Sequence, residues 1–246
     1  MEEEMIHPRP LQEEAYDMSG ARLALTLCVM KAREGSEADI SALEHMFKQL
    51  RFENTTKRDP TAQQFQEELK NFQDVIDNWK EPVSCAFVVL MAHGEEGLLK
   101  GEDGEMVKLD DLFETLNNKN CRALRGKPKI YIVQACRGEH RDLGETIGGD
   151  EMVMVTKDEP QTIPTYTDTV HVYSTVEGHL AYRHDVDGST FIQTLTDVFC
   201  NRKGPILQLL TEVTRRMAKA ELVQEGTARK VNPEIESTLR KQLYLQ

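Results

Sequence analysis

Short apolar runs alternate along the chain with stretches whose apolar residues recur at helical spacing. The runs have the length of buried strands and lie at residues 23–29, 86–92, 130–133 and 170–173. The helical stretches lie at residues 40–50, 59–76, 191–199 and 206–217, the second with Asp59 as N-cap and Pro60 in the first turn. Uniformly apolar strands separated by amphipathic helices predict an α/β fold: an open, mostly parallel β-sheet with helices on both faces, in three layers (α/β/α).

Three segments lie outside this alternation. The first sixteen residues are polar and predict a short N-terminal extension. Residues 239–245 alternate enough to predict a terminal strand. Residues 137–167 are rich in glycine and acid and lack a sustained period, except for a short strand expected from Met152 to Val155. Long loops of this kind are usually functional or disordered, so both a tolerated surface insertion and a processing loop fit.

Composition and charge argue against several classes of partner and site. The net charge of -12 and the pI near 5.1 disfavour binding to a phosphate backbone, so no nucleic-acid partner is expected. The N-terminus is acidic and the apolar runs are too short to span a bilayer, so no membrane association is expected. Five cysteines without a C-x-x-C pair argue against a disulfide framework and a zinc site. No cofactor is expected, and the predicted compartment is the cytoplasm, with the nucleus as a second one.

Candidate chemistry lies at the ends of two predicted strands. Open parallel sheets bind ligands at the carboxyl ends of their strands, and His93 and Cys136 each follow an apolar run there. Cys28 and Cys85 lie in or at the start of apolar runs and fit buried positions, and nothing in the polar turn around Cys121 points to chemistry. Cys136 differs because polar Gln134 precedes it and Arg-Gly follows it, so its thiol can face a cleft. A cysteine at a strand end is by itself a weak indication of catalysis.

The residues around this cysteine form a known pattern. Gln134-Ala135-Cys136-Arg137-Gly138 with a histidine upstream is typical of caspases, and His93 stands 43 positions before Cys136. Other blocks that resemble this family, from about Tyr16 to the C-terminus, are residues 91–97, 126–129, 173–175 and 188–189. The resemblance implies a caspase-like fold and a cysteine endopeptidase that hydrolyses peptide bonds after aspartate through a Cys-His dyad.

The resemblance also implies roles for residues of the reaction centre. Cys136 is the expected nucleophile, and His93 is the expected acid and base. The backbone N–H groups of Gly94 and Cys136 are the expected oxyanion donors. No third member of a triad is evident in the sequence, and a backbone carbonyl can orient the histidine instead.

Aspartate recognition is implied for a second set of residues. Arg33, Gln134 and Arg183 are expected to bind the substrate carboxylate, for which the planar fork of arginine is well suited. Ala181 and Tyr182 are expected to pair with the substrate as an added strand. They stand where many caspases have serine and tryptophan, so preference beyond aspartate does not follow.

Caspases are made as zymogens, which implies a division of the chain. The expected parts are a short N-terminal extension (1–16), a large catalytic subunit (17–143), a processing loop (144–165) and a small catalytic subunit (166–246). The candidate region for the activating cut contains Asp142, Asp150, Met152 and Asp158. Leu143, Glu151 and Glu159 follow the three aspartates, whereas the family prefers a small residue there. We therefore expect poor self-cleavage and an activating protease that opens the loop.

The expected partners are protein substrates with aspartate at the cleavage position, the activating protease and a second copy of the large-plus-small unit. Two rival interpretations remain at this stage. One is a catalytically weak, caspase-like scaffold that regulates partners without cutting them, which both His93 and Cys136 argue against. The other is a related cysteine peptidase of basic specificity, which needs acids where Arg33 and Arg183 stand.

Overall fold

The structure is a computed structural model that describes residues 14–95, 97–136, 163–175, 183–184, 187–220, 222–224, 227–229 and 231–246. At 183–184, 222–224 and 227–229 only the backbone is described. The strand expected from Met152 to Val155 lies outside these ranges.

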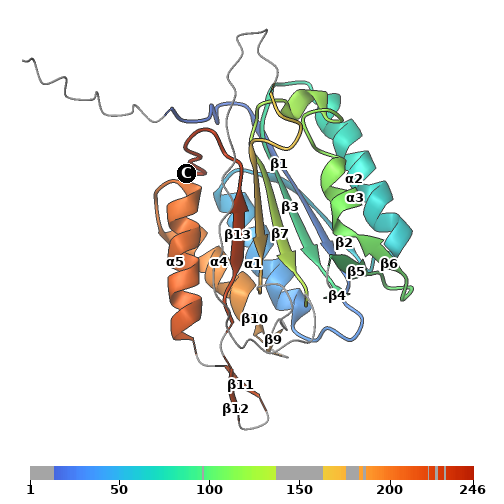
Figure 1. Cartoon of the computed structure of the whole chain (residues 1–246), viewed down its shortest axis with the longest axis vertical. Helices are drawn as coiled ribbons and strands as arrows, with labels where there is room; N and C mark the ends of the chain where they lie inside the picture. The colour runs from blue at the N-terminus through green and yellow to red at the C-terminus, as the bar shows by residue number, and fades with distance from the viewer. Residues whose placement is uncertain are drawn as a thin grey trace, which may run out of the picture.

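A six-stranded sheet forms the centre of the molecule, in the order β13-β8-β7-β3-β1-β2 (Figure 1). Its strands are β1 (Ala21–Cys28), β2 (Glu53–Arg58), β3 (Val83–Met91), β7 (Lys129–Gln134), β8 (Thr169–Tyr173) and β13 (Glu234–Ser237). All neighbouring strands are parallel except β13, which is antiparallel to β8. The predicted mostly parallel sheet is therefore confirmed, and it joins strands from both sides of the loop at residues 137–162.

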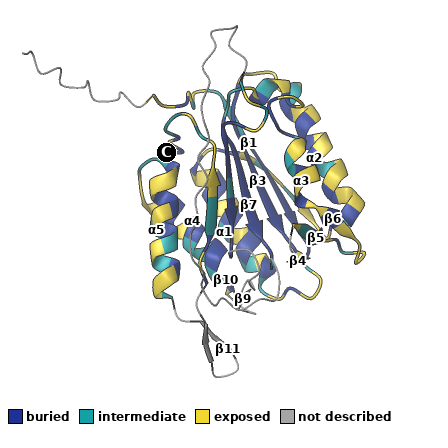
Figure 2. Cartoon of the chain, viewed as in Figure 1, coloured by how far each residue is buried: buried dark blue, intermediate teal, exposed yellow. Residues whose placement is uncertain are grey.

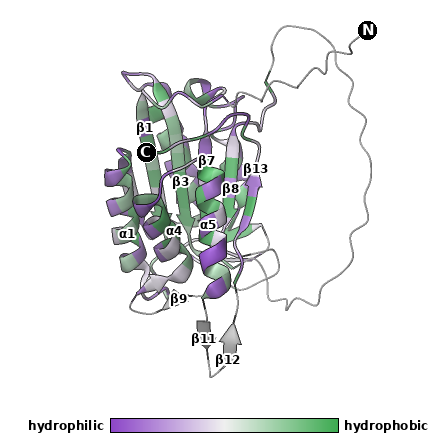
Figure 3. Ribbon diagram, turned by 90° about the vertical axis from the view of Figure 1, so that its left-hand side faces the viewer, coloured by the Kyte–Doolittle hydropathy of each residue, from purple (hydrophilic) through white to green (hydrophobic). Residues whose placement is uncertain are grey.

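Helices cover both faces of this sheet, which gives the predicted three layers. One face carries α1 (Ser36–Gln49), α4 (Thr190–Asn201) and α5 (Ile206–Lys219), and the other carries α2 (Ala62–Asp77) and α3 (Leu109–Glu114). Successive strand residues enter opposite cores, so Ile130 and Ile132 face α1 and α4 while Tyr131 and Val133 face α2 and α3. Figure 2 shows the buried sheet, and Figure 3 shows its hydrophobic strands behind helices with hydrophilic outer surfaces.

Two strand assignments differ from the sequence-based expectation. The predicted strand at residues 239–245 is wrong: the last strand is β13, and the tail makes two isolated bridges, Gln242 with Ala15 and Tyr244 with Pro205. Its alternation arises because Leu243 and Leu245 are buried in the core beside α5. Strand β2 was not predicted, because Glu53–Arg58 is polar throughout and lies at the edge of the sheet.

The start of α2 also differs from the expectation. Thr61, rather than Asp59, caps the helix: its side chain accepts from Gln64 N, and the Gln64 side chain accepts from Thr61 N. Asp59 instead adopts a positive φ of 52°, and its carboxylate accepts from Met30 N at 2.6 Å. Its carboxylate thus fixes the loop that follows β1.

Short elements gather at the carboxyl ends of the parallel strands (Figure 1). A three-stranded antiparallel sheet consists of β4 (His93–Glu95), β5 (Leu98–Lys100) and β6 (Met106–Lys108). The pair β9 (Arg183–His184) and β10 (Gly188–Ser189) and the hairpin β11 (Leu222–Gln224) and β12 (Thr227–Arg229) also lie at this end. The 3₁₀ helix η1 (Arg122–Leu124) lies at the other end of the sheet, near the start of β7. Among the helices of the described ranges, none is long and apolar enough to cross a bilayer.

His171 on β8 is packed among aromatic rings. Its ring centroid lies 4.3 Å from that of Phe113 and 5.3 Å from that of Tyr131, on which it stacks. Its buried Nε2 has no hydrogen-bond partner among the described residues, and Nδ1 lies 3.9 Å from Glu236 Oε2. Burial lowers the pKa of His171 to about 4, although the charge of Asp110 acts in the opposite direction. The imidazole is therefore neutral at pH 7.

This burial predicts a pH dependence of stability. Histidine in the unfolded chain titrates near 6.5, so between that pH and about 4 the unfolded state binds more protons and acid destabilises the fold. From pH 7 to pH 5, His171 should lower the free energy of unfolding by about 2 kcal/mol.

Urea unfolding at the two pH values tests this contribution. His171→Phe, which suits the aromatic surroundings, should show a smaller loss on acidification than the wild type by about this amount. His45→Gln, at an exposed position on α1, is the matched control and should behave as the wild type. An unchanged pH dependence in His171→Phe would contradict the assignment.

Candidate active site

The register between β3 and β7 places His93 and Cys136 at the same level of the sheet. Met91 and Gln134 are paired Cα partners in these parallel strands, and Ala92 N donates to Gln134 O at 3.3 Å. His93 and Cys136 each follow two residues after this pair. Adjacent strands are about 4.8 Å apart, so the two segments leave the sheet side by side.

Gly94 keeps the two segments in contact. A Cβ atom at this position would lie 2.9 Å from Cys136 O, 3.0 Å from Ala135 Cβ and 2.8 Å from Leu98 O. These distances leave no space for a side chain, and two of the three neighbours belong to the cysteine segment. The absence of a side chain at Gly94 therefore lets the histidine strand approach the backbone at Cys136.

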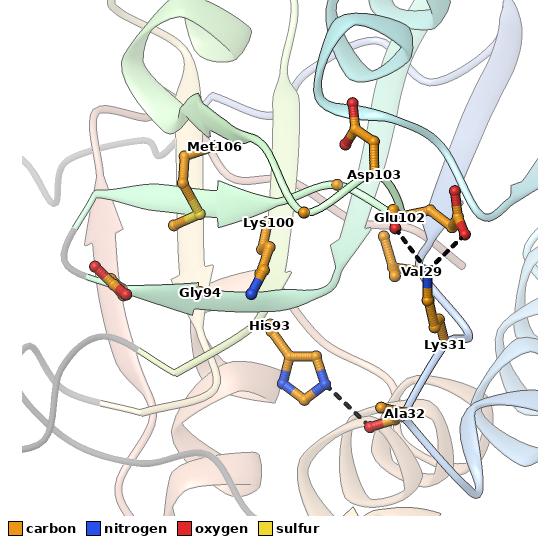
Figure 4. A pocket seen from close by; sticks show the side chains of 12 residues that line it. Val29, Lys31, Ala32, His93, Gly94, Lys100, Glu102, Asp103 and Met106 are labelled. Atoms are coloured by element: carbon orange, nitrogen blue, oxygen red, sulfur yellow. Dashed lines mark hydrogen bonds and ion pairs between the residues drawn. The ribbon is translucent and has the colours of Figure 1, made fainter.

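The ring of His93 is held by a backbone carbonyl, the alternative to a carboxylate that the sequence left open. Its Nε2 lies 3.0 Å from Ala32 O (Figure 4). A carbonyl oxygen can only accept a hydrogen bond, so Nε2 carries the proton and Nδ1 is left with a lone pair. The carbonyl of Ala32 thus takes the orienting role that a carboxylate has in a triad. The sequence carries no signal for it, because any residue supplies a carbonyl.

Cys136 differs from the other cysteines in its surroundings. It is partly exposed, whereas Cys28, Cys85 and Cys121 are fully buried. Burial raises the pKa of the Cys28 thiol, and raises the pKa values of Cys85 and Cys121 to about 12. These three therefore remain protonated thiols at pH 7. Cys200, also partly exposed, lies on α4 rather than at a strand end.

Arg33 is buried in the loop that also supplies Ala32 O. Its exposed fraction is 2%, and its Nη1 donates to Val29 O at 3.0 Å and to Ser36 Oγ at 3.4 Å. A buried guanidinium is costly unless polar groups or an anion compensate it. One short loop therefore carries both the carbonyl that orients His93 and a buried cation.

Asp39, a residue that the sequence analysis did not identify, lies near this cation. Burial raises the pKa of its carboxyl group, while hydrogen bonds from Gln193 and Ser189 and the charge of Arg33 lower it. Ser189 N donates to Asp39 Oδ1 at 2.9 Å. Asp39 thereby ties α1 to the start of α4 and to β10. An acid at the first turn of a helix is common, so its sequence position alone gives no indication of this role.

Gln134 ends β7 on the same face of the sheet as Arg33. It is 2% exposed, and its Oε1 has no hydrogen-bond partner among the described residues. Cys28, Met91 and Gln134 are paired in register across three strands, and Arg33 Nη1 lies 3.6 Å from Cys28 Sγ. Two strand spacings of about 4.8 Å separate the ends of this row, so Gln134 and Arg33 border the same region.

The structure describes only part of the remaining expected site residues. The backbone of Arg183 pairs with Ser189, whose N–H binds Asp39, so it lies at the same end of the sheet. Ala181 and Tyr182, and the processing candidates Asp142, Asp150, Met152 and Asp158, lie outside the described residues. Within the described ranges, no group of three or more His, Cys, Asp or Glu side chains could hold a metal ion.

Comparison with known proteins identifies the family to which the chain belongs. A family model described as the caspase domain matches residues 21–244. The chain is 78% identical to human caspase-14 over 98% of its length and all of that protein, and 71% identical to mouse caspase-14 over the whole of both. It is 35% identical to caspase-3 of Mesocricetus auratus, over 87% of this chain and 77% of that protein. The chain therefore belongs to the caspase family and is a cysteine endopeptidase of the aspartate-specific type.

Proposed function

We propose that the chain hydrolyses the peptide bond after aspartate through a dyad of Cys136 and His93. The observation that carries this proposal is the contact of the His93–Gly94 strand with the Cys136 backbone, together with the hydrogen bond from His93 Nε2 to Ala32 O. The thiolate of Cys136 attacks the scissile carbonyl carbon, and the C–N bond then breaks to leave a thioester. Nδ1 of His93 takes the proton of the Cys136 thiol and gives it to the leaving nitrogen. It then takes a proton from the water whose oxygen attacks the thioester carbon, and returns that proton to the Cys136 sulfur as the C–S bond breaks.

The charge that develops on the carbonyl oxygen needs fixed donors. We assign this role to the backbone N–H groups of Gly94 and Cys136, because the close approach at Gly94 brings these two segments together. One donor of this kind contributes about 10²–10³ in rate in other acyl-transfer enzymes. The lack of a side chain at Gly94 is then a catalytic requirement as well as a packing one.

Aspartate specificity rests on Arg33, Gln134 and Arg183. The buried Arg33 supports this assignment, because a desolvated cation strongly favours a substrate with a carboxylate. The buried amide of Gln134 has an oxygen without a described partner, and rotating the amide exchanges oxygen and nitrogen, so the amide can donate to a substrate at that point. Ala181 and Tyr182 would bind the preceding substrate residues as an added strand.

Activation involves partners and a cut in the chain. The proposed division is an extension (1–16), a large subunit (17–143), a processing loop (144–165) and a small subunit (166–246), with another protease opening the loop. The active form would be a dimer of large-plus-small units. Within the described ranges β13 pairs on one side only, with β8, and thus offers an edge. All five cysteines are free thiols, which supports a reducing compartment, the cytoplasm or the nucleus.

Replacing the nucleophile tests the reaction itself. Cys136→Ala should abolish hydrolysis of an aspartyl peptide without unfolding the protein, because it removes only a partly exposed thiol. Cys200→Ala, which removes another partly exposed thiol, is the matched control and should retain activity. Turnover by Cys136→Ala within tenfold of the wild type would mean that another residue is the nucleophile.

Replacing the cations tests specificity. Arg183→Ala should lower kcat/KM for aspartyl peptides at least 10²-fold, which corresponds to about 2.7 kcal/mol of transition-state binding. Arg33→Ala should act similarly, and the exposed, Glu37-paired Arg58 provides a control as Arg58→Ala. The readout is the ratio of kcat/KM for aspartate against alanine at the cleavage position. A ratio that survives both substitutions would place the pocket elsewhere.

Replacing Gly94 tests the close approach of the two segments. In Gly94→Ala the new methyl group should displace the histidine strand from Cys136 and lower kcat/KM about 10- to 100-fold. Gly97→Ala has the opposite effect: the new methyl group meets no neighbouring atom, but the positive φ of 70° strains any residue other than glycine. It should lower the unfolding midpoint and preserve activity. Equal activity losses in both variants would argue against a specific role for Gly94.

A further inference from the structure

A pocket of about 600 Å³ lies beside His93, bounded by the loop after β1 and the small sheet β4–β6 (Figure 4). Among its lining residues are His93, Lys100 and Met106. Arg33, Gln134 and Cys136 do not line it. The pocket is therefore separate from the region assigned to the substrate aspartate, and the imidazole of His93 forms part of its wall.

His93, Lys100 and Met106 form a row across the small sheet. His93 is the paired partner of Lys100 in β4 and β5, and Lys100 is the paired partner of Met106 in β5 and β6. Side chains of directly paired residues point to the same face, with Cβ atoms about 4.5–5.5 Å apart. Figure 4 shows the ammonium group of Lys100 directed toward the imidazole of His93.

The charged groups of this pocket have different partners. Lys31 Nζ binds Glu102 Oε1 at 3.0 Å, and Asp103 Oδ1 accepts from the backbone N–H groups of Ala62 and Glu105. Glu95 lies at the far end of β4, two residues and thus about 6–7 Å beyond His93. Lys100 makes no ion pair with a described residue. The ammonium nearest His93 is therefore available to a ligand.

The reaction of the proposed dyad determines which part of a substrate lies beside this pocket. His93 must reach the leaving nitrogen, so the residue that follows the scissile bond lies alongside the imidazole. We propose that this pocket binds that residue and that Lys100 selects an acidic side chain, glutamate above all, whose methylene groups would contact Met106. This assignment rests on the proposed dyad of His93 and Cys136. Glu95 lies further along the strand, where its charge disfavours an acid at later positions.

The inference changes one expectation drawn from the sequence. Asp150 and Asp158 are each followed by glutamate, which was counted against self-cleavage. With Lys100 beside the leaving residue, the glutamate in these bonds is favoured severalfold over a neutral residue of the same size, so its charge alone does not count against cleavage. Both bonds lie outside the described residues, so the consequence concerns their sequence alone.

The test uses the processed, active enzyme and internally quenched peptides that differ only in the residue after aspartate: glutamate, glutamine or glycine. In the wild type, kcat/KM for the glutamate peptide should exceed that for its glutamine counterpart about threefold, the size expected of an exposed ion pair, and less at high salt. Lys100→Met should bring this ratio to about one, and Lys100→Glu should reverse it. Lys108→Met removes the same charge from the small sheet at a position that does not line the pocket, and should leave the ratio unchanged.

A second substrate separates selection from a general effect on catalysis. A peptidyl-aspartyl aminocoumarin has no amino acid after aspartate, so Lys100→Met should hydrolyse it within about twofold of the wild type. A wild-type glutamate-to-glutamine ratio of one, or a ratio that persists in Lys100→Met, would overturn the role of Lys100. Failure of the wild type to hydrolyse any of these substrates, the glycine peptide and the aminocoumarin included, would overturn the proposed function and this assignment with it.

Discussion

The parallel register of β3 with β7 is the constraint on which the site depends. It pairs Met91 with Gln134, so the chain leaves the sheet two residues later at His93 on one strand and Cys136 on the other. A shift of one residue would turn these strands' side chains to opposite faces, because the side-chain period of a strand is two. Both strands are buried throughout, and the two apolar cores hold the register on both faces. The geometry of the dyad is therefore fixed by two strands that are buried along their whole length.

The loop after β1 adds what the two strands cannot supply. Ala32 O orients the imidazole, and the next residue, Arg33, is a cation that is only 2% exposed. Asp59 holds this loop through Met30 N, and Asp39 joins the following helix to Ser189. Because the same few residues carry the orienting carbonyl and the guanidinium, a displacement of this loop would disturb catalysis and specificity together.

The sequence predicted the elements whose pattern reflects burial and did not predict those set by local geometry. The apolar runs gave β1, β3, β7 and β8, and the motif around Cys136 predicted its pairing with His93. Polar β2 has no hydrophobic signal, and the alternation of Leu243 and Leu245 reports core packing, not strand pairing. Ala32 could not be predicted because its contribution is a backbone atom, and the small sheet β4–β6 is too short for its period to be recognised.

The two sides of the scissile bond meet environments of different polarity and rigidity. In the proposed assignment, Arg33 and Gln134 bind the substrate aspartate from buried positions in the loop after β1 and at the end of β7, so selection can reach about 10⁴–10⁵. On the leaving side, Lys100 is exposed on a three-residue strand, and water competes for its charge. A solvated lysine can bias the choice of the next residue severalfold but cannot enforce it. The proposed assignments therefore imply strong selection for aspartate combined with a weak preference at the next residue, because one set of charged groups is buried and the other is exposed.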